Sequence, residues 1–136
     1  MVFQRYLSAL TSPTGLPAGT PGLLLWDVVN EPESGGNTNL PGEAPGPRWT
    51  FVKWAVKYMQ SSTTTPTTVG VCNVVSLAVV GADVDVLSFH SYHQNWEGGL
   101  LMTQSALGFS AQFKKPVFNS ETGCIGRASK KHSTRI

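Results

Sequence analysis

Four short apolar runs alternate along the chain with stretches in which apolar residues recur at helical spacing. The apolar runs span residues 23–29, 67–72, 85–90 and 116–120, and the helical stretches span 2–10, 47–60, 74–80 and 99–113. Short runs of this kind, each ended by turn residues, are typical of strands that are covered on both faces. The alternation of helix and strand predicts an α/β fold whose parallel strands are joined by right-handed crossovers.

Glycine and proline mark the boundaries between these elements. The segment Ser12-Pro13-Thr14-Gly15 ends the first helix, and residues 33–46, rich in Gly, Pro and Asn, form a predicted loop. A proline at position 47 suits the first turn of the next helix, where its missing N–H costs no hydrogen bond. Residues 126–136 show no apolar periodicity. We therefore predict one domain over residues 1–125 and an irregular or disordered basic tail over 126–136.

The composition is that of a globular protein of one domain. Of the 136 residues, 40% are hydrophobic and 13% are charged, and the apolar runs are too short to span a bilayer. The net charge of +2 reflects four basic residues near the end of the chain, Arg127, Lys130, Lys131 and Arg135. A solvated terminus explains them better than nucleic-acid or membrane binding, so we predict neither partner. The first seven residues lack the features of a signal peptide, and the localisation is left open.

Cysteine and histidine give no metal-ligand pattern. Cys72 and Cys124 are too far apart for paired ligands, and small buried hydrophobes are a more common role for such residues than a disulfide. The three histidines form no zinc constellation either. We predict that the protein uses no metal and no cofactor.

Two glutamates stand where apolar runs stop. Glu31 lies in the segment 26–32, Trp-Asp-Val-Val-Asn-Glu-Pro, and Glu121 lies in 116–123, Pro-Val-Phe-Asn-Ser-Glu-Thr-Gly. The carboxyl ends of parallel strands share one rim, where functional residues collect. Two acids on one rim suit glycoside hydrolysis, in which a separation of about 5 to 5.5 Å gives retention and about 6.5 to 9.5 Å gives inversion.

A third strand end carries His90-Ser91-Tyr92-His93. Alternation sends His90 and Tyr92 to one side of the strand and the other two residues to the opposite side. His90 and Tyr92 could therefore face a substrate together, or form an ordinary packed pair. Three aromatic side chains could stack on sugar rings or pack in the core, namely Trp49, Tyr92 and Trp96.

These three motifs, at 26–32, 89–93 and 116–123, occur in an order that resembles the second half of a clan A glycoside hydrolase. The cellulase and mannanase group of family five is most similar. In that clan a (β/α)8 barrel carries Asn-Glu at the end of strand four, His-x-Tyr at strand six and Glu at strand seven. The resemblance implies a parallel half barrel of TIM type, whose four strands correspond to strands four to seven.

The resemblance also implies roles for individual residues. Glu31 would be the general acid/base and Glu121 the nucleophile of a retaining double displacement on β-linked glycosides. Asn30 would contact the sugar 2-hydroxyl, His90 would line the sugar subsite, and Tyr92 would donate a hydrogen bond to Glu121. Trp96 remains a candidate substrate-binding residue, as a surface on which a sugar ring could stack. Strands one to three and eight have no counterpart, so the Arg, His and Trp that the family places there are absent. The family-like run stops after residue 125, and the following basic segment resembles a truncation or a frame change.

A half barrel leaves two parallel edges unpaired. We therefore expect a homo-oligomer, in which two copies place the Glu121 strand of one beside the Glu31 strand of the other and close an eight-stranded barrel. A second interpretation is a truncated, inactive fragment that folds by self-association and at most binds sugar weakly. A third is an esterase with Ser88, Ser91 or Ser120 as nucleophile, which the absence of a Gly-x-Ser-x-Gly motif disfavours.

Overall fold

The computed structural model describes residues 2–17, 19–34, 46–93 and 95–123. It is an α/β structure, as the alternating pattern predicts. The strands are β1 (Trp26–Asn30), β2 (Thr67–Val71), β3 (Leu87–Tyr92) and β4 (Val117–Gly123). The helices are α1 (Val2–Thr11), α2 (Pro47–Ser62), α3 (Leu77–Val80) and α4 (Trp96–Phe113), with a 3-10 turn, η1 (Val74–Ser76), before α3. The predicted tail at 126–136 and most of the predicted loop lie outside the described residues.

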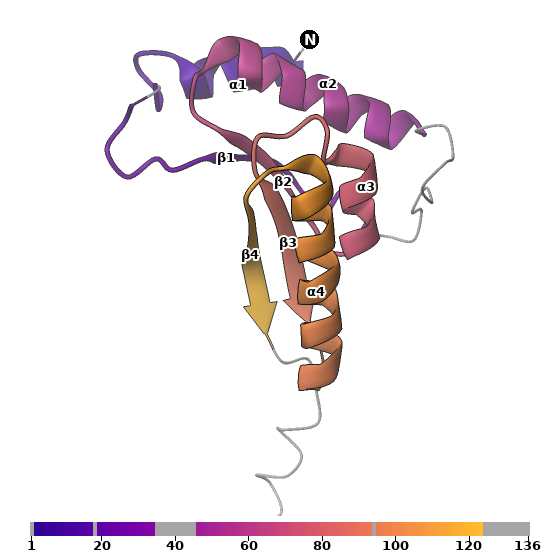
Figure 1. Ribbon diagram of the computed structural model, residues 1–136. Helices are drawn as coiled ribbons and strands as arrows, with labels where there is room; N and C mark the ends of the chain where they lie inside the picture. The colour runs from indigo at the N-terminus through magenta and orange to yellow at the C-terminus, as the bar shows by residue number, and fades with distance from the viewer. Residues whose placement is uncertain (1, 18, 35–45, 94, 124–136) are drawn as a thin grey trace, which may run out of the picture.

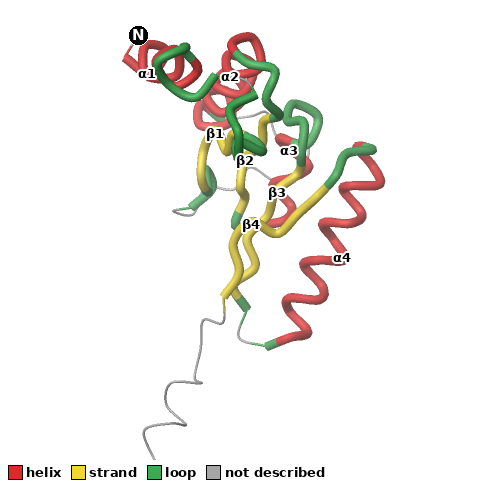
Figure 2. Tube along the Cα trace, turned by 90° about the vertical axis from the view of Figure 1, so that its left-hand side faces the viewer, coloured by secondary structure: helices red, strands yellow, loops and turns green. Residues whose placement is uncertain are grey.

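The four strands form one parallel sheet in the order β1-β2-β3-β4. Helix α2 contacts β1 and β2, α4 contacts β3 and β4, and α3 contacts both of these helices. Figure 1 shows α1 lying along α2 above the sheet, and Figure 2 shows α4 standing on one side of the strands. Within the described residues, β1 and β4 are therefore the two edge strands.

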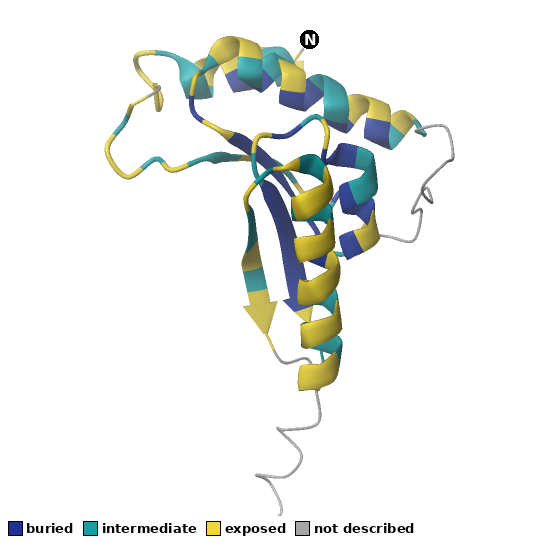
Figure 3. Cartoon of the chain, in the orientation of Figure 1, coloured by how far each residue is buried: buried dark blue, intermediate teal, exposed yellow. Residues whose placement is uncertain are grey.

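The hydrophobic core lies between the sheet and these helices. Strand residues Val69, Val71, Leu87 and Phe89 point into it, and they meet buried side chains of α2, α3 and α4 that include Trp49, Val52, Val56, Leu77, Val80 and Ala106. Because side chains alternate along a strand, the residues at the alternate positions of β2 and β3 face away from the helices. Among them are Thr68, Gly70, Ser88 and His90. Figure 3 shows β2 and β3 as buried, whereas the outer surface of α4 is largely exposed.

Several element boundaries differ from the sequence prediction, and β3, for example, spans Leu87–Tyr92 rather than residues 85–90. The first strand begins at Trp26 rather than residue 23, because its partner β2 starts at Thr67, opposite Trp26, directly after a proline. Helix α4 begins at Trp96 rather than residue 99, since the Asn95 side chain caps it by accepting from the Gly98 N–H. The fourth strand continues to Gly123 rather than ending at residue 120.

Among the described residues, no helix combines the length and the apolar character needed to cross a membrane. Trp49, which the sequence left as either a sugar-stacking or a packing residue, is fully buried in the core. It is therefore a packing residue.

Candidate active site

Two glutamates from opposite edges of the sheet meet near the carboxyl ends of the strands. Glu31 directly follows β1 and Glu121 lies in β4, while His90 and Tyr92 come from β3 between them. All four side chains line one hollow of about 540 Å³. The complete lining is Glu31, Cys72, His90, Tyr92, His93, Met102 and Glu121.

His90 stands between the two glutamates. Its side chain is only 1% exposed, and its Nδ1 atom lies 2.7 Å from Oε1 of Glu31 and 3.6 Å from Oε2 of Glu121. The shorter distance is that of a hydrogen bond, and the longer one is an electrostatic contact. A single imidazole nitrogen therefore connects the two carboxylates.

An irregularity in the pairing of β3 with β4 lies next to Glu121. Phe89 pairs with Asn119, but the next residue of β3, His90, pairs with Glu121. Ser120 is thus one extra residue in β4, which defines a β-bulge. The sequence prediction that Glu121 ends the strand is wrong, because the strand runs two residues further.

This bulge directs Glu121 into the hollow. In a regular strand Ser120 and Glu121 would point to opposite faces of the sheet. Here the Ser120 hydroxyl lies 2.5 Å from that of Ser88, and the Glu121 carboxylate accepts a hydrogen bond from Tyr92. Ser88 and Tyr92 lie on the same face of β3 because they are an even number of residues apart. Both neighbours in β4 consequently reach one face, and bulges near functional sites often re-aim a side chain in this way.

Tyr92 holds the Glu121 carboxylate by a short hydrogen bond. Its hydroxyl donates to Oε2 of Glu121 over 2.9 Å. This hydrogen bond raises the pKa of Tyr92, and burial and the negative charge of Glu121 act in the same direction. Tyr92 therefore stays a hydrogen-bond donor to Glu121 over a wide pH range.

Glu31 leaves the sheet through a left-handed backbone conformation. Its φ angle is 43°, its N–H donates to the Gly70 carbonyl over 2.8 Å, and its own carbonyl accepts from the Ser34 N–H over 2.9 Å. For a residue other than glycine, this conformation costs about 1–2 kcal/mol. Strain of this kind is common where a side chain must be aimed at a site.

A buried acid anchors the turn that carries Glu31. Glu33 is 3% exposed, and its Oε1 atom accepts from the Asn73 N–H over 2.8 Å, which joins the loops after β1 and β2. The pKa of the Cys72 thiol is raised to about 11, mainly by burial and to a smaller extent by the nearby negative charges of Glu33 and Glu31. A thiol that is protonated at neutral pH is a weak nucleophile, so Cys72 contributes a wall of the hollow.

Two predicted substrate-binding residues lie outside this hollow. Asn30 is exposed at the end of β1 and is not among the lining residues. Trp96 is 73% exposed at the start of α4. It lines a neighbouring hollow of about 410 Å³ together with Ser91, His93, Asn95, Gly99, Thr122 and Gly123.

The three serines considered for an esterase are not arranged as nucleophiles. Ser88 and Ser91 are buried, and the Ser120 hydroxyl is hydrogen-bonded to Ser88. Within the described part of the chain, no histidine is hydrogen-bonded to any of the three. An activated serine requires such a base.

Sequence reasoning missed three lining residues, Cys72, His93 and Met102. Cys72 directly follows β2 and thus occupies the same rim position that singled out Glu31, so this signal was present in the sequence. His93 was expected on the face opposite His90. Strand β3 ends at Tyr92, however, so alternation no longer governs His93, and its Nε2 atom lies 3.4 Å from the Met102 sulfur.

A histidine and two carboxylates could also hold a divalent metal ion. One ligand atom from each of Glu31, His90 and Glu121 lies within 4.8 Å of the others. The short contact between Nδ1 of His90 and Oε1 of Glu31 has the length of a direct hydrogen bond. Such a contact needs no ion, and we treat the three groups as a hydrogen-bonded network.

Residues separated in the chain thus form one polar site, with two carboxylates, an imidazole and a phenol around a hollow. Such a set can transfer protons, and one carboxylate can attack an electrophilic carbon while the other acts as acid and base. Comparisons of the chain with family models, with curated proteins and with solved structures found no match.

Proposed function

We propose that the chain is a retaining glycoside hydrolase of clan A, most similar to family five, that acts on β-linked glycosides or polysaccharides. One observation supports this most strongly. Glu31 follows the first strand of the sheet and Glu121 lies in the last, yet both converge on Nδ1 of His90. Glycoside hydrolysis requires two carboxyl groups that flank one bond, and here His90 lies between two such groups on one rim.

The fold is compatible with half of a (β/α)8 barrel. Its four strands are parallel and sequential, and the helices lie on the side of the sheet that carries the apolar core. In a barrel the opposite, inner side carries the site at the carboxyl ends of the strands. His90, Tyr92 and Glu121 lie on that side, and the proposal therefore assigns β1 to β4 to strands four to seven of the barrel.

The separation of the glutamates favours retention. An oxygen of Glu31 lies within 4.8 Å of an oxygen of Glu121. Retaining enzymes hold their carboxyl groups about 5 to 5.5 Å apart, whereas inverting enzymes leave about 6.5 to 9.5 Å for a water molecule. The present arrangement leaves little room for such a water between the two groups.

The two glutamates differ in their surroundings, and this suggests their division of roles. Glu121 accepts a hydrogen bond from Tyr92, which holds its carboxylate in one orientation, as a nucleophile requires. Glu31 lies at hydrogen-bond distance from the His90 imidazole, a group that can exchange a proton with it. Glu31 would protonate the leaving oxygen, Glu121 would attack the anomeric carbon, and Glu31 would then activate water to hydrolyse the glycosyl-enzyme.

Hydrolysis of aryl β-glycosides, β-glucan and mannan tests this proposal. The wild type should release product with retained anomeric configuration, measured by ¹H NMR immediately after mixing. Glu31→Gln and Glu121→Gln should each lower the rate by about 10²–10⁴-fold. Glu97→Gln is the matched control, because Glu97 is exposed in the first turn of α4. Equal rates in all four proteins, or an inverted product, would contradict the proposal.

A second candidate is a fragment that folds by self-association and binds sugar weakly or not at all. The edge strands β1 and β4 and two apolar helix surfaces favour association. Val2 and Tyr6 are exposed on α1, and Trp96, Leu100, Leu101 and Leu107 are exposed on α4. In a barrel closed by two copies, β4 of one copy would pair with β1 of the other, and α1 would then cover the exposed leucines of α4.

Sedimentation equilibrium tests this association. The wild type should be a dimer, and Leu101→Lys should shift it toward monomer at equal concentration. Gln104→Lys, which adds the same charge at another exposed position of α4, should remain a dimer. A monomeric wild type with a cooperative melting transition would rule out closure by two copies. A dimer without hydrolysis would support the second candidate function over the first.

A further inference from the structure

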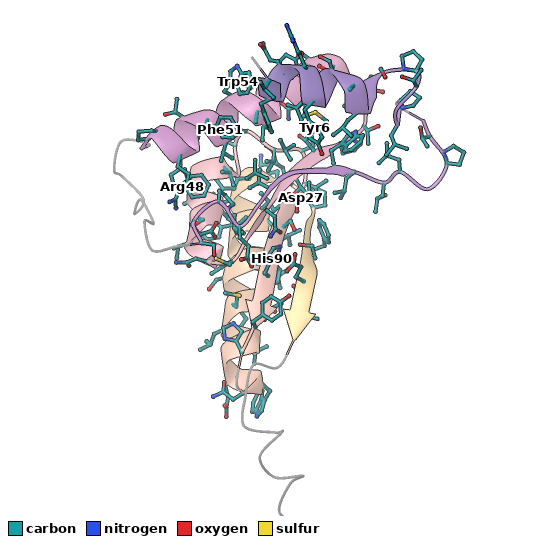
Figure 4. All side chains as sticks on the ribbon, turned by 180° about the vertical axis from the view of Figure 1, so that it is seen from behind. Tyr6, Asp27, Arg48, Phe51, Trp54 and His90 are labelled. Atoms are coloured by element: carbon teal, nitrogen blue, oxygen red, sulfur yellow. The ribbon has the colours of Figure 1, made fainter. Side chains whose placement is uncertain are left out.

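Gly70 in β2 separates an aspartate from the buried histidine of the site. Its neighbours Val69 and Val71 point into the core, so position 70 opens toward the face that carries His90. A Cβ atom at position 70 would lie 2.5 Å from Nε2 of His90 and 2.7 Å from Oδ2 of Asp27. Only glycine leaves this space between the two polar atoms. Figure 4 labels both Asp27 and His90, seen from behind.

The two atoms that face this space have no direct hydrogen bond to each other. Nε2 of His90 is buried and without a protein partner within the described residues. Asp27 uses its other oxygen, Oδ1, to accept from the Gly70 N–H over 3.1 Å, which orients Oδ2 toward the imidazole. Buried polar groups that lack a protein partner are commonly joined through water.

We propose that Asp27 is a positioning residue for His90, and that one water molecule in front of Gly70 accepts from the His90 Nε2–H and donates to Oδ2 of Asp27. These two hydrogen bonds of the water keep a proton on Nε2 of His90. This inference rests on the proposed function only for its consequence in catalysis. The tautomer of His90 can be measured whether or not the chain hydrolyses a glycoside.

With a proton held on Nε2, one further proton is shared between Nδ1 of His90 and Oε1 of Glu31. When this proton lies on Glu31, the imidazole is neutral and Glu31 is a carboxylic acid that can protonate a leaving oxygen. When it lies on Nδ1, the imidazole is a cation and Glu31 is a carboxylate. Asp27 thereby prevents the neutral Nδ1–H tautomer, in which Glu31 would only accept a hydrogen bond and would have no proton to deliver.

The charged and titratable groups around His90 come from every strand. Asp27 and Glu31 belong to β1 and the turn after it, Cys72 follows β2, Tyr92 lies in β3 and Glu121 in β4. Burial raises the pKa of Asp27, while the Gly70 N–H and the charge of His90 act in the opposite direction. As a carboxylate, Asp27 can accept a hydrogen bond from the water and so keep the Nε2 proton of His90 in place.

The ring nitrogen signals of the full chain labelled with ¹⁵N-histidine test this proposal. The His90 signals are assigned by their loss in His90→Gln, and spectra are recorded at about pH 8, where histidine is ordinarily neutral. The wild type should show the Nε2–H tautomer. In Asp27→Asn the amide oxygen should accept from the Gly70 N–H, so that the amide NH₂ faces the water. The water would then accept from this NH₂ and donate to Nε2 of His90. The neutral imidazole should therefore shift toward the Nδ1–H tautomer.

Two further variants complete the experiment. Asp85→Asn is the matched control, because Asp85 binds Thr67 and Gln60 rather than the site, and it should keep the wild-type signals. Gly70→Ala should lose the Nε2–H signature, since its Cβ would lie 2.5 Å from Nε2 and 2.7 Å from Oδ2 and leave no room for the water. A wild-type imidazole that is neutral and carries its proton on Nδ1 rather than Nε2, or equal tautomer populations in wild type and Asp27→Asn, would overturn the proposal. If the wild type hydrolyses nothing, the proposed function fails, while these spectra still decide the role of Asp27.

Discussion

The Nδ1 atom of His90 lies 2.7 Å from Oε1 of Glu31, although the two residues are 59 positions apart in the chain. The contact joins an edge strand to the third strand of the sheet, across Gly70 of β2. It is made possible by the absence of a side chain at position 70 and by the left-handed backbone of Glu31. The geometry of the site thus depends on backbone features as much as on the two reactive groups.

The hydrogen bond between Tyr92 and Glu121 should be visible in the titration of Tyr92. Because this bond raises the pKa of Tyr92, replacing Glu121 by Gln should lower that pKa toward its ordinary value of about 10. Absorbance of the phenolate, taken as the difference between each protein and its Tyr92→Phe counterpart, measures the change. An unchanged Tyr92 titration in Glu121→Gln would mean that the bond does not persist in solution.

The left-handed conformation of Glu31 should reverse the usual order of alanine and glycine. Both Glu31→Gly and Glu31→Ala remove the side chain, but glycine adopts a φ of 43° without strain. We expect Glu31→Gly to have a free energy of unfolding about 1 kcal/mol higher than Glu31→Ala. At Gln104 in α4 the same pair should differ in the opposite direction by about 1 kcal/mol. Urea denaturation of the four proteins measures both differences, and alanine being better at both sites would refute the strain.

Lys115 should stabilise the loop after α3. Its ammonium donates to three backbone carbonyls, those of Gly81 at 2.8 Å, Ala82 at 2.9 Å and Val84 at 2.5 Å. Hydrogen bonds to a charged group contribute about 1.5–3 kcal/mol. Lys115→Met should therefore lower the free energy of unfolding by about 2 kcal/mol.

The adjacent Lys114→Met is the control for this change. Lys114 is exposed at the end of α4, so the same substitution there should alter stability by less than about 0.5 kcal/mol. Chemical denaturation of both variants and the wild type gives the comparison. Equal losses in the two variants would show that the three hydrogen bonds of Lys115 add nothing.

Asp85 should make the stability of the fold depend on pH in the acid range. Burial raises the pKa of Asp85, but hydrogen bonds from the Thr67 N–H, the Thr67 hydroxyl and Gln60 outweigh it and hold the pKa below its ordinary value. A lowered pKa in the folded state contributes stability above the unfolded value of about 3.9 and loses it as the pH falls through the folded value. The stability difference between wild type and Asp85→Asn should therefore be full at about pH 7 and shrink below about pH 4. A difference that stays constant to about pH 3 would contradict this role.

Much of the fold could be predicted from local patterns. The order of helices and strands and their parallel arrangement follow from apolar periodicity, which reflects which face of each element is buried. Boundaries were less predictable, because they depend on partners. Trp26 starts β1 only because Thr67 is there to pair with it, and the Asn95 side chain moves the start of α4 to Trp96.

By itself, the sequence determined that Glu31 and Glu121 lie near the carboxyl ends of strands, and it determined the parallel α/β fold that places these ends on one rim. Only the tertiary structure decided how these groups meet. The bulge at Ser120 turns Glu121 to the face of His90, and Gly70 leaves the space beside that imidazole. Both depend on the register between strands, which is set by contacts between distant segments and leaves no mark in the local pattern of apolar and polar residues.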